Sequence, residues 1–295
     1  MKLSTRFAEA GFLVTGEVGP AKGADASEAL AGAALMAPVV DAVNVTDNQS
    51  AVMRLGSMAV SHLIKEEGIE PVFQVTCRDR NRIALQSDLL SAATLGVENV
   101  LCITGDHMVL GDHGEAKKVF DLDSVQLLAA AKGLSEGRDL AGHEIDSPPE
   151  FCLGAVVNPG SDDLEMQLLK MRKKIDVGAE FFQTQAVFDP AAFARFMEKA
   201  EAFGVPILVG LVPLKSARMA TYMDQNIAGV SVPQRLVDRL AETKREDRKK
   251  VSIEIAADLA RQMKTMCQGV HLMPLGWDDV VAPIVELAEL GSTPP

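Results

Sequence analysis

The stretch KKIDVGAEFFQTQAVFDP, residues 173–190, contains the connection that recurs along the whole chain. A segment of helical periodicity ends there at Gly178 and is followed by the apolar run EFFQTQ at 180–185. Glycine suits the left-handed conformation that closes a helix, and a short, nearly continuous apolar run is typical of a parallel strand covered by helices. The stretch therefore predicts a helix-to-strand connection of an α/β protein.

Seven further apolar runs of the same kind lie on either side of this strand. They are FLVTGEV (12–18), AVNVT (42–46), PVFQVT (71–76), ENVLCIT (98–104), CLGAVV (152–157), VPILVGL (205–211) and VHLMPL (270–275). Segments with apolar residues at helical spacing lie between them, at 50–66, 82–95, 162–178, 190–203 and 278–290. Eight strands alternating with helices predict a closed (β/α)₈ barrel, the TIM barrel, rather than an open doubly wound sheet.

The length of the chain agrees with a single barrel domain over residues 1–295. A barrel takes about 250 residues, which leaves room in a chain of 295 residues for insertions. We expect loop insertions at about 107–122, after the fourth strand, and at about 136–150, a polar stretch that contains two prolines.

Composition and charge exclude several classes of partner. The chain is 47% hydrophobic and 24% charged, and its formal net charge is −12. Nucleic acids and anionic membranes reward basic surfaces, so we expect neither as a partner. No run reaches the roughly 18 apolar residues of a membrane span, and residues 1–20 lack the pattern of a secretion signal. The four cysteines show no CxxC spacing, so the chain is expected to be reduced and cytoplasmic, without a metal site.

Polar residues gather at the carboxyl ends of the predicted strands. In a (β/α)₈ barrel these ends meet at one mouth, where active sites lie. Burying an unpaired polar side chain is unfavourable, so such a ring on otherwise apolar strands indicates a ligand site. The ring consists of Glu17, Asn44, Thr46, Asp47, Gln74, Thr76, Arg78, Asp79, Thr104, Asp106, Asn158, Gln183, Gln185, Lys215 and His271. His271 either points into the barrel or is satisfied within the core, and the sequence leaves both possibilities open.

Five motifs along the chain resemble those of methylenetetrahydrofolate reductases, in the same order. They are GEVGPAKG (16–23), VNVTDN (43–48), FQVTCRD (73–79), VLCITGD (100–106) and the stretch 173–190 quoted above. The resemblance covers roughly residues 10–290. It implies flavin-dependent reduction of 5,10-methylenetetrahydrofolate to 5-methyltetrahydrofolate, a step of one-carbon metabolism and methionine biosynthesis. FAD is the expected flavin rather than FMN.

Position by position, the resemblance implies roles for three residues. Glu17 matches the general acid of the family, because opening the imidazolidine ring of the substrate requires protonation of the leaving amine. Asp106 matches an acidic residue near flavin and pterin, where a negative charge disfavours the anionic reduced flavin. Gln185 matches a glutamine that binds the amide edge of the pterin. The alternatives without a functional role are a turn for Glu17, a helix cap for Asp106 and a backbone-bound amide for Gln185.

The expected cofactor site has both matches and departures. Thr46, Gly105 and Lys174 match flavin-contacting positions of the family. Gln74, Thr104 and Asn158 occupy cofactor-binding positions where other members have His, Arg and Tyr, and we assign them to the same site. The segment at 212–220 lacks a phenylalanine that in some members stacks on nicotinamide or folate. The electron donor is therefore NADH, NADPH or a partner subunit, and we expect a homo-oligomer or a larger complex.

Other functions compete with this one. The main alternative is a pterin-binding methyltransferase barrel without flavin, and a second is an inactive barrel that serves as a scaffold. The loop residues His107, Asp112 and His113 have the chemistry of metal ligands. However, a metal site needs ligands that converge from fixed elements, so we expect a surface loop there.

Overall fold

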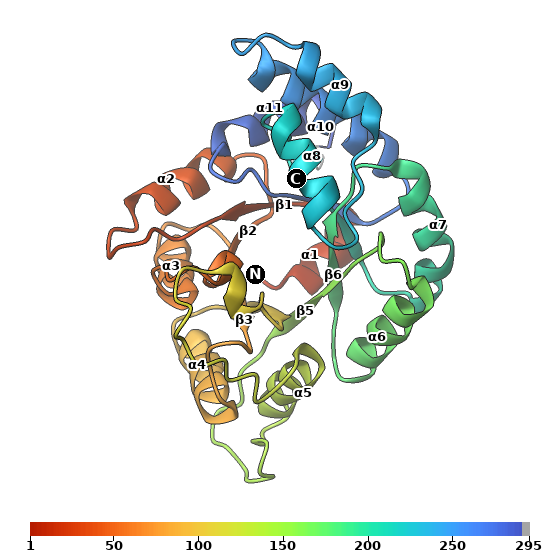
Figure 1. The fold of residues 1–295 in the computed structure, drawn as a ribbon. Helices are drawn as coiled ribbons and strands as arrows, with labels where there is room; N and C mark the ends of the chain where they lie inside the picture. The colour runs from red at the N-terminus through yellow and green to blue at the C-terminus, as the bar shows by residue number, and fades with distance from the viewer. Residues whose placement is uncertain (291–295) are drawn as a thin grey trace.

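The computed structural model describes residues 1–290, in which eight parallel strands form a closed barrel in sequence order (Figure 1). The strands are β1 (Leu13–Val18), β2 (Ala42–Val45), β3 (Pro71–Thr76), β4 (Asn99–Ile103), β5 (Cys152–Val157), β6 (Phe181–Ala186), β7 (Ile207–Leu211) and β8 (Gly269–Leu272). Closure comes from the parallel pairing of β8 with β1, which sets Thr15 beside His271. The predicted barrel is confirmed, and every strand falls on a predicted run.

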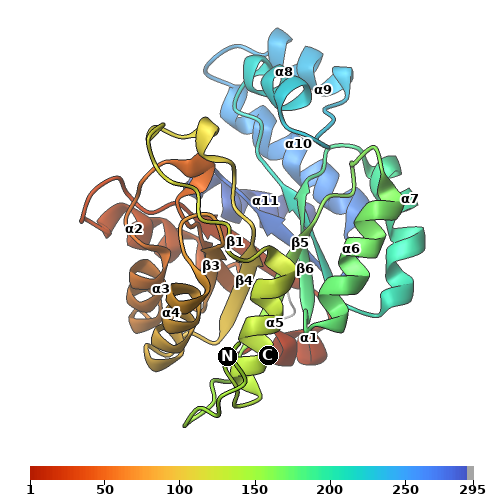
Figure 2. The same ribbon diagram turned by 60° about the horizontal axis from the view of Figure 1, so that its bottom comes forward.

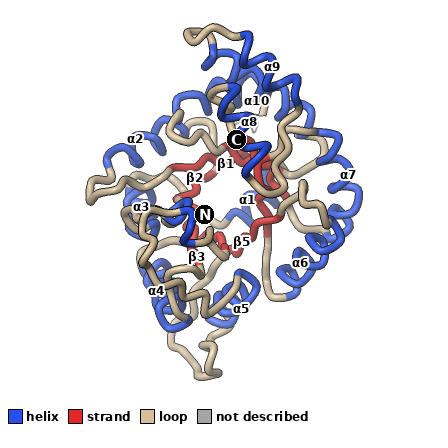
Figure 3. The backbone as a smooth tube through the Cα atoms, in the orientation of Figure 1, coloured by secondary structure: helices blue, strands red, loops and turns tan. Residues whose placement is uncertain are grey.

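Helices surround the barrel on its outside (Figures 1 and 3). In chain order they are α2 (Ser27–Met36), α3 (Ser57–Glu66), α4 (Arg82–Thr94), α5 (Ser124–Ser135), α6 (Leu164–Asp176), α7 (Pro190–Ala200), α8 (Ala217–Asn226), α9 (Gln234–Glu242), α10 (Arg248–Met263) and α11 (Val281–Ala288). Short 3₁₀ helices are η1 (Gln49–Ala51), η2 (Met108–Leu110), η3 (Glu201–Phe203) and η4 (Asp278–Val280). The further helix α1 (Leu3–Ala10) precedes β1. None of these helices is long and apolar enough to cross a bilayer within residues 1–290.

Local sequence signals explain where several helices start and stop. Asp123 and Gln126 form a capping box at the start of α5, which satisfies backbone groups that the first turn leaves unpaired. Pro190 opens α7 directly after its cap, Asp189, where a missing N–H costs nothing. Gly178, in the quoted stretch, has a φ of 112° and follows α6, as expected for a glycine that ends a helix.

The predicted helix at 50–66 is wrong over residues 50–56, because α3 begins only at Ser57. The segment before it contains η1, and Asn48, Ser50 and Ala51 have φ values of 46°, 56° and 58°. Such left-handed conformations are uncommon outside glycine and cluster at functional sites. Hydrophobic spacing alone does not report this turn, because tertiary contacts hold it.

The two ends of the barrel differ in what covers them. Figure 2 places α1 and the loop at 136–150 at one end and α8 and α9 at the other. The loop at 136–150 joins α5 to β5, so it lies at the amino ends of the strands, whereas the loop at 107–122 follows β4 and lies at the carboxyl ends. Below the mouth, a buried apolar cluster fills the lumen with Leu3, Leu13, Ala42, Val72, Leu101, Cys152, Phe181 and Leu208. Leu3 of α1 belongs to this cluster and closes the amino end.

Candidate functional site

Above the apolar cluster, six buried polar residues point into the lumen. They alternate along the strands with apolar residues that pack under the helices, as the period of two in a strand requires. We call them the polar layer, and its members are Thr15, Glu17, Asn44, Gln74, Gln183 and His271. All six are buried, so each needs a polar partner within the protein or a ligand.

Glu17 lies at the upper side of the polar layer, where 9% of the residue is exposed. Its Oε2 atom accepts a hydrogen bond of 3.0 Å from Nε2 of Gln74 on β3. Nε2 of His271 on β8 lies 3.5 Å from the same oxygen. The predicted acid therefore projects into the lumen, between two polar side chains that come from other strands.

Hydrogen bonds continue downward from His271 and connect the rest of the layer. Nδ1 of His271 lies 2.9 Å from Oγ1 of Thr15, to which Nε2 of Gln183 donates at 3.4 Å. The amides of Gln183 and Asn44 bond each other in both directions, at 2.7 and 3.1 Å. Because these residues satisfy one another, the layer is a fixed polar floor beneath the mouth.

Asp106 lies on the loop that follows β4, exposed at the mouth. Its Oδ2 atom accepts a hydrogen bond of 3.0 Å from the backbone N–H of Ser50, which belongs to η1 after β2. The same two loops touch again where Gly111 packs so closely on the Ala51 carbonyl that a side chain at 111 would collide with it. The left-handed turn at 48–51 thus has a structural cause and helps to place the Asp106 carboxylate.

Arg78 holds this part of the mouth together, and our sequence analysis gave it no role of its own. Although it follows a strand end, it is only 1% exposed. Its guanidinium makes two hydrogen bonds to Asp79, of 2.8 and 2.7 Å, and donates to the carbonyls of Asp106 and Asn48 at 3.3 and 3.2 Å. Burial opposes the charge of Asp79, but the bonds from Arg78 prevail and lower its pKa. A charged residue directly after the FQVT strand was the available signal.

Two of the predicted ligand-binding residues have side-chain groups that remain available. The Thr46 hydroxyl is buried and has no hydrogen-bond partner within residues 1–290. Gln185 is exposed at the end of β6, and no hydrogen bond of its amide occurs in the same part of the chain. Gly105 has a φ of 90° and lies against the side chains of Thr76 and Arg78, and Thr104 before it is exposed.

The other two predicted cofactor residues, Asn158 and Lys174, bond to the protein backbone. Nδ2 of Asn158 donates to the Ala228 carbonyl at 3.0 Å, which ties the loop after β5 to the segment after α8. Nζ of Lys174 donates to the Val156 carbonyl at 2.7 Å. Burial lowers the pKa of this lysine to about 8. Gln74 contacts Glu17, so its amide supports the predicted acid.

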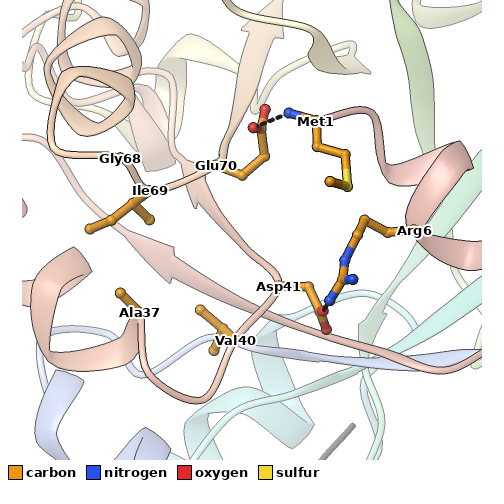
Figure 4. Close-up of a pocket in the computed structure, with 8 residues that line it drawn as sticks. All are labelled: Met1, Arg6, Ala37, Val40, Asp41, Gly68, Ile69 and Glu70. Atoms are coloured by element: carbon orange, nitrogen blue, oxygen red, sulfur yellow. Dashed lines mark hydrogen bonds and ion pairs between the residues drawn. The ribbon is translucent and has the colours of Figure 1, made fainter. Parts of the chain in front are cut away.

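The loop histidines and the cavities lie apart from the polar layer. Asp112 forms ion pairs with Lys22 and His113, and within residues 1–290 no group of three His, Cys, Asp or Glu side chains could hold a metal. A cavity of about 430 Å³ lies on the mouth side, between Gly160 and the segment 224–231. A second, of about 280 Å³, lies at the amino ends of the strands, where Met1 pairs with Glu70 (Figure 4).

The chain is similar to known proteins in sequence and in fold. The family profile described as methylenetetrahydrofolate reductase matches residues 2–289. Methylenetetrahydrofolate reductase 1 of Schizosaccharomyces pombe is 24% identical over 74% of this chain, and the match spans only 35% of that relative. The 5,10-methylenetetrahydrofolate reductase of Salmonella typhimurium is 25% identical, over 74% of this chain and 70% of the relative.

Among solved structures, a Clostridium thermocellum protein described as binding two copies of 5-methyl-5,6,7,8-tetrahydrofolic acid has the same fold. Its TM-score is 0.65 at 16% identity, and the match covers 98% of this chain and 99% of that one. At this identity the likeness concerns the fold alone. The profile, by contrast, matches nearly the whole sequence, and from this we conclude that the chain belongs to the methylenetetrahydrofolate reductase family.

Proposed function

We propose that the protein is a flavin-dependent oxidoreductase that reduces 5,10-methylenetetrahydrofolate to 5-methyltetrahydrofolate. The observation that carries the proposal is the position of Glu17, a buried carboxyl in the lumen directly beneath the mouth and bonded to Gln74. Family membership supports it, as do the names of the relatives. The chain spans about a third of the length of the first eukaryotic relatives, so the substrate is part of the proposal.

Glu17 acts as the general acid in this proposal. Reduction requires that one carbon–nitrogen bond of the imidazolidine ring opens, and the departing amine needs a proton. A carboxyl in a site closed off from bulk water can protonate this nitrogen without competition from solvent. Gln74 fixes the orientation of the carboxyl by donating to Oε2.

Asp106 and Gln185 bind the pterin from two loops of the mouth that are separated by a single strand, β5. They follow β4 and end β6, respectively, and both are exposed. A carboxylate accepts hydrogen bonds from pterin N–H groups, and a primary amide both donates and accepts. Asp106 is held by Ser50 and by the loop that Arg78 anchors, so its carboxylate is in place before a ligand binds.

The residues at the mouth fit a flavin ring. The unpartnered Thr46 hydroxyl offers a hydrogen bond, and Gly105 permits the left-handed backbone conformation that packs the loop after β4 against Thr76 and Arg78. Thr104 is exposed beside it. When bound, a flavin supplies the hydride. Lys174 and Asn158, now bonded to backbone carbonyls, would hold the more distant parts of the cofactor, and we expect FAD rather than FMN.

The electron donor and the assembly complete the proposal. NADH and NADPH are both candidates, since relatives carry each in their names. The segment after β7 has Leu214 and Lys215 and no aromatic residue at 212–220, which favours transfer from a partner subunit of a larger complex. We assign the reaction to cytoplasmic one-carbon metabolism that feeds methionine synthesis.

One experiment tests the core of the proposal. The protein is purified, its absorbance is recorded, and the released chromophore is identified by mass. Separate samples of the protein are then reduced with NADH, NADPH or dithionite. Each sample is mixed with methylenetetrahydrofolate. We expect a yellow protein and methyltetrahydrofolate as product, with dithionite working even if neither nucleotide does. A colourless protein that transfers a methyl group without reductant would refute the proposal and support the methyltransferase alternative.

A further inference from the structure

Two ionisable groups, Glu17 and His271, meet at the centre of the polar layer. Only 3% of His271 is exposed. Its Nε2 atom lies 3.5 Å from Oε2 of Glu17, and its Nδ1 atom lies 2.9 Å from Oγ1 of Thr15. Each ring nitrogen therefore faces one polar atom, which fixes the orientation of the imidazole.

We propose that His271 shares a proton with Glu17 and keeps the carboxyl supplied for proton transfer at neutral pH. This inference rests on the proposed function, in which Glu17 protonates the substrate. An imidazolium beside a carboxylate is stabilised by the opposite charge. A proton held between Nε2 of His271 and Oε2 of Glu17 therefore belongs to the pair and is available to the carboxyl. His271 acts through Glu17 and is a positioning residue.

The transfer balances with a single proton. It crosses from Nε2 of His271 to Oε2 of Glu17, and from the carboxyl to the amine nitrogen of the substrate. The carbon–nitrogen bond that breaks leaves its electron pair on that nitrogen, which holds the proton afterwards. Glu17 and His271 are left as carboxylate and neutral imidazole, and water returns one proton to the pair when the product leaves the mouth.

The polar neighbours of the pair within the lumen are uncharged. Thr15 contacts His271 directly, Gln183 and Asn44 connect to it through Thr15, and Gln74 contacts Glu17. On β7 the residue in register with His271 is Gly210, which has no side chain.

The charged residues that follow β2, β7 and β8 contact groups other than Glu17 and His271. Nζ of Lys215, after β7, donates to the Leu275 carbonyl at 2.6 Å. The carboxylate of Asp278, after β8, lies against α2 at Gly32. Asp47, after β2, is held by Thr76 and Arg80. In the part of the chain that the structure describes, Glu17 is thus the ionisable group that contacts His271.

The first test is an NMR titration of the histidine rings in the intact protein. The His271 signal is identified by its loss in His271→Gln or, if that variant does not fold, by its displacement in Thr15→Val. We expect its midpoint to lie about one pH unit or more higher in the wild type than in Glu17→Gln, because the carboxylate stabilises the imidazolium. His62, whose ring contacts the Leu95 carbonyl outside the lumen, serves as the internal control. Equal midpoints in the two proteins would overturn the proposal.

The second test is the pH dependence of single-turnover folate reduction in the flavin-reduced protein. His271→Gln should be slower than the wild type at both pH 8 and pH 6, and the loss should be several-fold greater at pH 8, because a carboxyl that titrates alone loses its proton earlier. His62→Gln should follow the wild type. An equal loss at both pH values would indicate a structural role and overturn the proposal. If the His271 midpoint is higher in the wild type than in Glu17→Gln but the wild type does not reduce the folate, the proposed function fails and the proton sharing between His271 and Glu17 stands.

Discussion

The two halves of the barrel lumen are built from the same strands, yet they contain opposite chemistry. Near the amino ends, Leu13, Leu101 and Phe181 form a dry cluster closed by Leu3 of α1. Toward the carboxyl ends, Glu17, Gln183 and His271 occupy later inward positions of β1, β6 and β8, in a polar layer. The lower half gains its stability from apolar burial, whereas the upper half supplies fixed polar groups at the mouth. The comparison predicts that substitutions below reduce stability, whereas substitutions of upper residues that face the ligand reduce activity.

The largest effect is expected for Glu17→Gln, which keeps the shape of the side chain and removes its acidity. Folate reduction should fall by about 10²–10⁴-fold, as for a lost general acid. Flavin content and thermal stability should stay near the wild-type values. The rate is measured by mixing reduced protein with methylenetetrahydrofolate. Full activity in this variant would remove Glu17 from the mechanism.

Phe181→Ala tests the apolar half. The ring is fully buried and fills the space above Gly154, where a side chain would collide with it. We expect a loss of about 3–5 kcal/mol in the free energy of unfolding, as for a large aromatic residue removed from a core. Urea denaturation measures the loss. The folate reduction rate of the protein that remains folded should change little, and a selective loss of activity would contradict the division of the lumen.

Asp106→Asn examines a charge at the mouth above the polar layer. The amide oxygen can still accept from Ser50, so the loop should keep its position. With the negative charge removed, flavin reduction should become faster and folate reduction slower, each by about tenfold, the scale of one charge interaction in a solvent-exposed site. Stopped-flow measurement of the two half-reactions tests this. If neither rate changes, the carboxylate is remote from the flavin.

Gln185→Ala should have a smaller effect, again on binding. One neutral hydrogen bond contributes about 0.5–1.5 kcal/mol, so the dissociation constant of the folate should rise by about 2–10-fold with flavin occupancy intact. Gln183→Ala is the matched comparison two residues earlier on β6. Its amide is buried and paired with Asn44, so that variant should lose stability. Loss of flavin from Gln185→Ala would show that the residue binds the cofactor instead.

A separate effect, on stability alone, is expected outside the lumen, at Lys174. Burial lowers its pKa from 10.5 to about 8. Below pH 8 the amine is charged in both the folded and the unfolded chain, and the full cost of burying the charge is present. Between pH 8 and 10.5 the unfolded chain binds more protons, so the lysine makes stability rise with pH by at most about 1.4 kcal/mol per unit. In urea titrations of ligand-free protein, Lys174→Met should therefore be more stable than the wild type below pH 8, and this advantage should shrink toward pH 10. A constant difference would contradict burial of the charge.

Sequence periodicity predicted the strands well and the extra helices poorly. The eight apolar runs fixed the barrel because parallel strands covered by helices must be apolar on their outer face. Helices α1, α8 and α9 were not predicted, since the repeating strand-and-helix unit has no place for them. The first turn of 50–66 was predicted as helix, but contacts with the loop at 107–111 hold it in a left-handed turn.

Some site residues followed from the sequence and others did not. Glu17 was recognisable because it is an acid within an apolar strand. Its partners were not, because Gln74 and His271 lie 57 and more than 250 residues away in the chain and meet it only through closure of the barrel. The buried role of Arg78 was missed for the same reason, since its carbonyl partners come from two other loops.

The sequence by itself determined the order of the strands and most of the polar residues that face the lumen, because these depend on the period of two within short apolar runs. It also carried the motifs of the family. Only the tertiary structure decided which inward-facing residues touch. Pairing of β1 with β8 set Thr15 beside His271, and the strain at 48–51 arises where two distant loops pack together. Contacts of this kind depend on register and closure, which no local pattern encodes.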